Sequence, residues 1–242
     1  MTEELRHTER ISEPREDEEL KEMRDLVERA ANTANPLTPD IERLVKNHTK
    51  LLRRFNKIVS LSDSYQSQLR DFNLRLELMA HTDPLTGINN RGYFMELLGM
   101  EMERAKRYGR PFSVLVLDLD HFKSVNDTRG HAAGDEALRS LCQVIKGSGL
   151  RNSDFIGRLG GEEFAVAFPE TDCNGAMGAA EKVRMNLEKS EILHNGSAFF
   201  ITASIGVSEY RVGDTLEMVL NRADQAMYQA KASGRNRVCL SE

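Results

Sequence analysis

Mostly hydrophobic residues recur at heptad spacing between residues 41 and 79. The steps alternate between three and four residues without a slip, which is the a/d pattern of a left-handed coiled coil. The positions are Ile41, Leu44, His48, Leu51, Phe55, Ile58, Ser62, Tyr65, Leu69, Phe72, Leu76 and Met79. A single helix cannot bury this stripe, so we expect a parallel homodimer through residues 37–80, with a four-helix assembly left open. Packing of the helix on its own chain is the alternative.

The preceding segment, residues 1–36, is acidic and carries a shorter apolar stripe at helical spacing, which predicts a short amphipathic helix. The stripe consists of Leu20, Met23, Val27 and Ala30. Residues 1–30 hold eleven acidic and six basic residues, whereas residues 40–60 hold two acidic and six basic. These opposite charges would let the acidic segment of residues 1–36, called the arm, fold back on the coiled-coil segment of residues 37–80, called the stalk. They could also bind another protein. A solvated, partly disordered tail is an equal alternative.

The pattern changes beyond residue 80, where all 17 glycines of the chain lie. Apolar, branched runs predict strands at 112–119, 155–159, 163–168, 199–207 and 237–240. Helical periodicity predicts helices at 90–108, 133–147, 172–190 and 215–232. Gly160 and Gly161 separate the second strand from the third, which predicts a tight hairpin. This order predicts an α+β fold over residues 81–242, of ferredoxin-like or palm layout, with a central antiparallel sheet flanked by helices.

The composition narrows the class of protein. With 33 basic and 38 acidic residues, the net charge is −5, which argues against a general binder of nucleic acid or anionic membranes. No run of about 18 apolar residues is present, and the first residues lack the apolar core of a signal peptide, so we expect no membrane insertion. Cys142, Cys173 and Cys239 are widely spaced and form no CxxC pair. They predict small buried thiols in a reducing cytoplasm.

Carboxylates occur at two predicted turns. Asp118 lies at the end of the most apolar strand, where it suits Mg²⁺ bound together with phosphates, which Lys123 and loop N–H groups could hold. Glu162 and Glu163 follow the glycine pair, and adjacent glutamates in a turn are costly unless a metal neutralises them. If the hairpin lies beside Asp118, the three carboxylates complete one metal site. Solvated acids at a strand end and at a hairpin tip are the alternative.

Two further clusters could bind a nucleotide. Asn126 and Asp135 straddle a glycine-containing turn, and their amide and carboxylate match the donors and acceptor of guanine. Turn formation and helix capping are the alternative for this pair. Lys231 and Arg235, between the last helix and strand, could neutralise phosphate charge. The alternative is a favourable placement of basic residues at a helix C-terminus.

Five ordered motifs make residues 81–240 resemble a GGDEF domain, the catalytic domain of diguanylate cyclases. The first is D-P-L-T-G-I-N-N-R at 83–91, which resembles the family's opening D-x-L-T-G-L-x-N-R with Ile in place of the second Leu. The next two are D-x-D-x-F-K-x-x-N-D-x-x-G-H-x-x-G-D at 118–135 and the Glu form of GG(D/E)EF at 160–164. The last two are the penultimate strand at 202–207 and A-D-x-A-(L/M)-Y-x-A-K-x-x-G-R-N-x-V at 223–238.

The resemblance implies that two domains face each other, each with one GTP. Each 3'-hydroxyl then attacks the other α-phosphorus, giving cyclic di-GMP and two pyrophosphates. It implies Mg²⁺, with Mn²⁺ as a substitute, bound by Asp118, the Leu119 carbonyl, Glu162 and Glu163. The implied GTP contacts are His121, Phe122, Lys123, Asn126, His131, Asp135, Gly160, Gly161, Lys231 and Arg235. Glu162 would activate the 3'-hydroxyl, while Lys123, Lys231 and Arg235 would balance phosphate charge.

Arg151 and Asp154 form an R-x-x-D motif ahead of Gly160, at the offset of the family's inhibitory product site. An Arg at this place can bind phosphate or guanine, and an Asp can accept hydrogen bonds from guanine. We expect Lys182, or alternatively Arg184, to add a second basic contact. A turn with an exposed ion pair is the alternative.

Together these observations predict a cytoplasmic, GTP-dependent diguanylate cyclase that is a homodimer and is controlled by a protein partner on residues 1–80. The compact layout resembles stalked cyclases of the SiaD type. A catalytically silent cyclic di-GMP receptor is the alternative, but the presence of Asp118, Glu162 and Glu163 favours the enzyme. A cyclase for another base is a third reading, against which Asn126 and Asp135 argue.

Overall fold

The computed structural model describes residues 13–33 and 36–241. The chain divides into two compact units, the first ending at Asn73 and the second beginning at Leu74. The first unit contains α1 (Glu13–Asn32) and most of α2 (Thr38–His81). The two predicted helices of the N-terminal part are therefore present, whereas the expected disorder at the N-terminus falls largely on residues outside the described ones.

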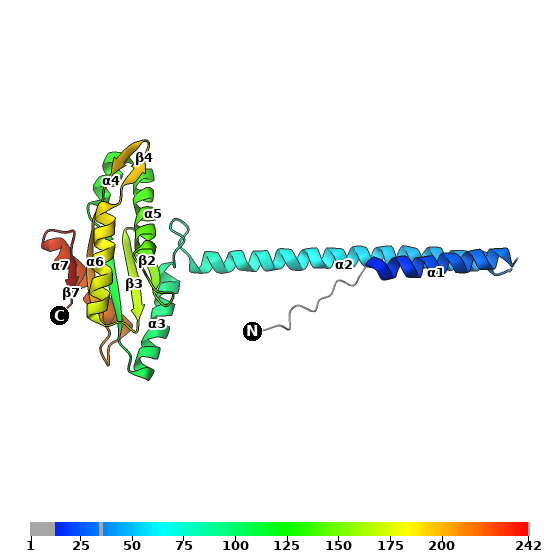
Figure 1. Ribbon diagram of the computed structural model, residues 1–242, viewed down its shortest axis with the longest axis horizontal. Helices are drawn as coiled ribbons and strands as arrows, with labels where there is room; N and C mark the ends of the chain where they lie inside the picture. Colours follow the sequence, from blue (N-terminus) through cyan, green and yellow to red (C-terminus); the bar gives the residue numbers. More distant parts are fainter. Residues whose placement is uncertain (1–12, 34–35, 242) are drawn as a thin grey trace. The chain divides into compact units, whose positions relative to one another are not determined.

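Within the first unit, α1 lies alongside the beginning of α2 (Figure 1). The predicted apolar stripe of α1 is its covered face, since Met23 and Val27 are half-buried and Ala30 is buried. The Thr38 hydroxyl donates to the carbonyl of Ala30 at 3.1 Å, and Val27 and Val45 line one hollow between the helices. The described part of the acidic segment, α1, is thus folded back on the basic beginning of α2, one of the arrangements left open by the sequence.

Most of the heptad stripe of α2 is left exposed. Ile41, Val45 and Leu52 are half-buried, whereas the a/d residues downstream remain largely in contact with solvent. Their exposed fractions are 62% for Phe55, 65% for Ile58, 64% for Tyr65, 61% for Leu69 and 58% for Phe72. An uncovered apolar stripe therefore runs along α2, and pairing with a second copy stays a prediction.

The second unit is built on a five-stranded sheet of order β2-β3-β1-β6-β7. The first three strands are β1 (Phe112–Leu119), β2 (Phe155–Gly160) and β3 (Glu163–Pro169), and the last two are β6 (Ala203–Glu209) and β7 (Val238–Leu240). A hairpin of β4 (Ile192–His194) and β5 (Ser197–Phe199) forms a separate two-stranded sheet. Neighbours in the main sheet are antiparallel except for β6 and β7. The α+β, ferredoxin-like fold is confirmed, with one parallel pair at the edge.

Helices cover both faces of this sheet. They are α3 (Arg91–Tyr108), α4 (Phe122–Arg129), α5 (His131–Gly147), α6 (Cys173–Lys189) and α7 (Leu216–Ala232). Side chains alternate along β1, so Leu115 and Leu117 pack in a core with α5 and α6, whereas Val114 and Val116 pack with α3 and α7. Because both faces are buried, β1 is apolar throughout rather than alternating in polarity.

Four sequence-based details differ from the structure. The strand predicted at 199–207 is two strands, β5 and β6, with residues 200–202 between them. The turn expected after Asp118 contains the helix α4, so Lys123 lies on a helix and not on a loop. The hairpin turn consists of Gly161 and Glu162, because Gly160 pairs with Glu163. Only Cys142 of the three free cysteines is buried.

Candidate active site

Asp118 lies near the end of β1, where the sheet register brings it opposite Glu163 on β3. Asp118 is only 5% exposed, and its carboxylate forms an ion pair with the Lys231 ammonium at 2.8 Å. Burial raises the pKa of Asp118 above its ordinary value, a shift that Lys231 opposes and that Asp120 and Asp224 reinforce. Leu119, the last residue of β1, pairs with Ala203 of β6.

The hairpin between β2 and β3 carries the other two predicted metal ligands. Glu162 occupies the turn and is half-buried, and Glu163 begins β3 with an exposed side chain. Burial raises the pKa of Glu162, Asp118 and Glu163 raise it further, and Lys231 opposes the rise. Glu162 is therefore close enough to Asp118 and Glu163 to feel their charges, as expected if the hairpin lies beside Asp118.

The donor set of this end of the sheet fits a divalent cation. The charges of Asp118 and Glu163 raise the pKa of Glu162, so a nearby positive charge would stabilise its ionised carboxylate, and hard oxygen donors suit Mg²⁺. In the part of the chain that the structure describes, no three His, Cys, Asp or Glu side chains are grouped closely enough to hold a metal ion. The three predicted carboxylate ligands thus lie at the same end of the sheet without forming a closed metal-binding group, and Lys231 is the present counter-charge of Asp118.

The close packing of α7 on β6 brings Lys231 to Asp118. A Cβ atom on Gly206 of β6 would lie 2.0 Å from the carbonyl oxygen of Ala223 and 2.2 Å from the amide nitrogen of Met227. Only glycine permits this approach of helix backbone to strand. Lys231 lies in the last turn of α7, and Arg235, which is exposed, follows in the turn to β7.

The predicted guanine-reading pair is split between α4 and α5. Asn126 is half-buried on α4, and Asp135 is half-buried on α5. A Cβ atom on Gly134 would lie 2.0 Å from the Asn126 side-chain oxygen, so the absence of a side chain there leaves room for the Asn126 amide next to Asp135. Of the remaining predicted GTP contacts, His121, Lys123 and His131 are exposed and Phe122 is buried.

Sequence reasoning missed the anchor of the Gly161–Glu162 turn. Arg158 of β2 donates to the Gly161 carbonyl at 2.7 Å and 3.1 Å, and to both carboxylate oxygens of Asp83 at 3.1 Å. Asp83 in turn accepts from the backbone N–H and the hydroxyl of Thr86. Arg158 thus ties the Gly161–Glu162 turn to the segment that follows α2. The sequence signal that could have indicated this anchor was Asp83, the first residue of the motif at 83–91, whose partner Arg158 lies 75 residues away.

The residues of the predicted inhibitory site lie near the start of β2. Arg151 is exposed, and its backbone N–H donates to the Asp154 carboxylate at 2.8 Å, so Asp154 also stabilises the turn. A hollow of about 340 Å³ is lined by Asp154 and by Lys146, a basic residue that sequence reasoning missed. The ammonium of Lys182 lies 3.0 Å from the position of a Cβ on Gly149. Arg151 and Asp154 thus share one turn, and Lys182 of α6 approaches the backbone at Gly149, two residues before Arg151.

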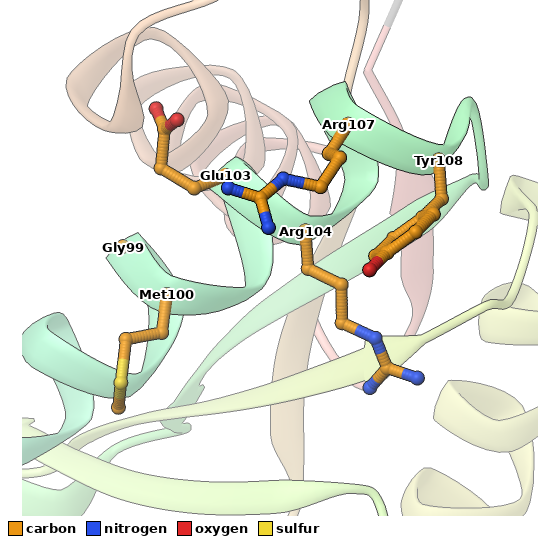
Figure 2. Close-up of a pocket in the computed structure, with 6 residues that line it drawn as sticks. All are labelled: Gly99, Met100, Glu103, Arg104, Arg107 and Tyr108. Carbon is orange, nitrogen blue, oxygen red and sulfur yellow. The ribbon is translucent and has the colours of Figure 1, made fainter.

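A larger hollow lies elsewhere, on α3. Figure 2 shows it, with Met100, Glu103 and Arg104 among the side chains at its edge. Its volume is about 440 Å³, and none of the predicted GTP residues lines it. It is therefore not part of the candidate site.

None of the helices within the described ranges combines the length and apolar character needed to span a membrane.

Comparisons with known proteins show which family the chain is similar to. Residues 80–237 match the model of the family described as diguanylate cyclase, GGDEF domain. A relative named diguanylate cyclase A, from Treponema denticola, is 40% identical over 174 residues, covering 70% of this chain and 47% of that protein. The chain therefore spans less than half the length of this relative.

Two solved structures extend the similarity into the helical region. The coiled coil and GGDEF domain of DgcB from Caulobacter crescentus, in complex with c-di-GMP, has 31% identity and a TM-score of 0.72, and the match covers 77% of this chain and 99% of that one. Diguanylate cyclase SiaD in complex with its activator SiaC, from Pseudomonas aeruginosa, has 36% identity and a TM-score of 0.66. That match covers 94% of this chain and 87% of SiaD.

Proposed function

Because the chain belongs to the GGDEF-domain family of diguanylate cyclases, we propose that it condenses two GTP molecules into cyclic di-GMP and two diphosphates. The observation that carries this proposal is the arrangement of Asp118, Glu162 and Lys231 at one end of the sheet, with their charges coupled. Each 3'-oxygen forms a bond to the α-phosphorus of the other GTP, while that phosphorus loses its bond to the diphosphate oxygen. Two protons leave the hydroxyls, one per bond formed.

Glu162 is the proposed acceptor of the 3'-hydroxyl proton. Burial and the charges of Asp118 and Glu163 raise the pKa of Glu162, so its carboxylate takes up positive charge, from a proton or from a bound cation, more readily than that of an ordinary glutamate. Its place in the hairpin turn is fixed by the Arg158 bonds to the preceding carbonyl. A base held in this way needs little rearrangement during proton transfer.

Cationic groups are proposed to balance the phosphate charge. Lys231 already lies beside the carboxylates, and the exposed Lys123 and Arg235 extend from neighbouring elements. Mg²⁺, or Mn²⁺ in its place, would be held by Asp118, the Leu119 carbonyl, Glu162 and Glu163. When bound, it would lower the pKa of the 3'-hydroxyl and neutralise charge on the phosphates.

Guanine is proposed to lie against Asn126 and Asp135, with His131 beside the base. The geometry at Gly134 supports this assignment, since it makes space for the Asn126 amide. His121, Phe122, Gly160 and Gly161 would line the ribose and phosphate part of the same site. The small glycine residues would allow a phosphate chain to approach the backbone.

We further propose a homodimer through residues 37–80, because one domain holds only half of the atoms needed for the ring. The uncovered stripe of α2 supplies the apolar surface for pairing. Tethering two domains in this way raises the effective concentration of each half-site for the other. The proposed division of the chain is an arm over residues 1–36, a stalk over 37–80 and a catalytic domain over 81–242.

Residues 1–80 are also the proposed docking region of an activating protein. SiaD, which matches nearly the whole chain, is described in complex with its activator SiaC. The fold-back of α1 on α2 would give such a partner a helical hairpin to bind. GTP as substrate makes the cytoplasm the proposed place of action.

Product inhibition is proposed at Arg151, Asp154 and Lys182. The hollow beside Asp154 would give a guanine base a place, and the two basic side chains would attract its phosphates. We expect Arg151→Ala to keep its initial rate and to lose inhibition, so that cyclic di-GMP accumulates well beyond the wild-type level. Progress curves with added cyclic di-GMP would measure this. Equal inhibition of both proteins would contradict this part of the proposal.

The activity itself is tested with full-length protein freed of bound nucleotide. Anion-exchange chromatography after incubation with GTP and Mg²⁺ should show cyclic di-GMP for the wild type. Glu162→Gln, which keeps the side-chain size, should reduce the rate by about 10²–10⁴-fold. Glu191→Gln removes an exposed carboxylate outside the site and should leave the rate unchanged. Absence of product from the wild type, with and without an activating partner, would contradict the proposed function.

A further inference from the structure

The turn that carries Arg235 has an unusual backbone. Gly234, Arg235 and Asn236 follow one another at φ values of 111°, 60° and 44°. Left-handed conformations are strained for a non-glycine residue and persist only where the surroundings fix them. Some feature of the fold must therefore hold Arg235 and Asn236 in place.

Asp120, two residues beyond Asp118, contacts this turn directly. One of its carboxylate oxygens accepts from the Asn236 backbone N–H at 3.0 Å and from the Thr202 hydroxyl at 2.7 Å. The other accepts from the Ser204 hydroxyl at 2.7 Å. Asp120 is only 4% exposed, so few water molecules can replace these bonds.

The Asn236 side chain is held from α6 as well. Arg184 donates to its carbonyl oxygen at 2.9 Å, and its amide donates to Glu188 at 2.8 Å. Arg184 is itself paired with Glu188 and Glu181. The Asn236 backbone is thus held by Asp120 at the end of β1, and the Asn236 side chain is held by α6. This contact of Arg184 differs from the one expected from the sequence, where Arg184 was the alternative to Lys182 at the inhibitory product site.

Two carboxylates at one strand end therefore hold the end of α7. Asp118 binds the Lys231 side chain, and Asp120 binds the backbone one residue after Arg235. We propose that Asp120, acting through Asn236, is a positioning residue that holds the Gly234–Asn236 turn and so sets Arg235 against the GTP phosphates. The catalytic half of this inference, the placing of Arg235 against GTP, rests on the proposed function. The structural half, the holding of the turn by Asp120, does not.

Hydrogen exchange of the Asn236 amide in the full-length protein tests the structural half. Asp120→Ala should speed exchange at this amide by about tenfold or more, because the amide loses its acceptor. Asp120→Asn should keep it protected, since the Asn oxygen can accept from the same two donors while its amide donates to Ser204. Ser204→Ala is the matched control, because it removes a bond to the same carboxylate without touching the turn.

Kinetics test the catalytic half. Asp120→Ala should lower kcat/KM for GTP by about 10–100-fold, the usual cost of losing a group that orients a binding residue. Asp120→Asn should retain most of the activity. If Asp120 acts through Arg235, the double variant Asp120→Ala/Arg235→Ala should be no more than about twofold slower than Arg235→Ala alone.

Unchanged exchange at Asn236 in Asp120→Ala would overturn the inference, whether or not the protein makes cyclic di-GMP. Multiplied losses in the double variant would show that Asp120 does not act through Arg235, and would overturn it as well. A wild type without cyclase activity would instead refute the proposed function, and the exchange experiment would still decide on the turn. Asn236→Gly removes the side-chain bonds to α6 and keeps the backbone N–H that donates to Asp120, and glycine tolerates the positive φ. This variant therefore separates the α6 bonds from the Asp120 bond.

Discussion

At the scale of single residues, glycines determine whether the polar groups of the site can meet. Gly206 lets the α7 backbone approach β6, and Gly134 leaves room for the Asn126 amide. Neither glycine has a positive φ, so their role is the space they leave and not a special backbone conformation. A side chain at Gly206 would meet backbone, which cannot move aside. A side chain at Gly134 would meet the movable Asn126 side chain, so a substitution there should change the geometry of the site and leave folding intact.

Gly134→Ala applies this to the base site. The added methyl group would displace the Asn126 side chain, whose oxygen lies 2.0 Å from its position. Loss of one hydrogen bond to guanine is worth about 1.4 kcal/mol, so KM for GTP should rise roughly tenfold with little change in kcat. Steady-state kinetics would measure it. Gly147→Ala on the same helix meets no atom within 4 Å and should behave as the wild type. An unchanged KM in Gly134→Ala would contradict the proposed place of the base.

At the scale of elements, the β2–β3 hairpin is fixed by contacts outside the sheet. Arg158 joins its turn to Asp83, and Asn89 donates to the Ile156 carbonyl at 2.8 Å. The segment after α2 is therefore bonded to the strand that leads into Glu162. In addition, the Asn90 amide donates to the Ala80 carbonyl at 2.7 Å, so the end of α2 is bonded to the start of α3.

The Asp83–Arg158 pair gives a pH-dependent prediction. Burial by itself raises the pKa of Asp83, but hydrogen bonds from Thr86 and the charge of Arg158 outweigh it and hold the pKa below its usual value. Such a group stabilises the fold above the unfolded-state pKa of about 3.9, and the effect is lost as the pH falls through the folded-state pKa. Asp83→Asn should therefore lower the free energy of unfolding by about 1–3 kcal/mol at pH 7 and by less below pH of about 4.

Urea denaturation at pH 7, 5 and 3.5 would measure this difference. Asp127→Asn is a suitable control, because Asp127 is an exposed carboxylate on α4. The explanation would be wrong if the difference between wild type and Asp83→Asn stayed constant, or grew, as the pH fell.

At the scale of the whole molecule, the proposed reaction needs two copies of the chain. A charge within the exposed heptad stripe should prevent their pairing, because an unpaired carboxylate in an apolar interface is strongly disfavoured. Leu69→Asp should therefore give a monomer and reduce cyclic di-GMP synthesis on the order of 100-fold at micromolar protein, since the tethered half-site is lost.

Light scattering after gel filtration, together with the cyclase assay, would test this. Ser67→Asp adds the same charge at an outer heptad position and should stay dimeric and active. A monomeric wild type with full activity, or a dimeric Leu69→Asp variant, would contradict pairing through α2.

The sequence by itself determined most of the elements, because periodicity reflects which faces are buried and is visible locally. It predicted the α2 helix and the apolar β1 strand bounded at Phe112 and Leu119, and it supplied the candidate carboxylates and cations of the proposed site. The tertiary structure alone decided the pairing of these groups: Lys231 with Asp118, Arg158 with Asp83, and Asp120 with Asn236. These contacts join residues 75 to 116 positions apart or come from different elements, so no local spacing encodes them. They depend on strand order and on the close approach of α7 to β6, which only the folded chain establishes.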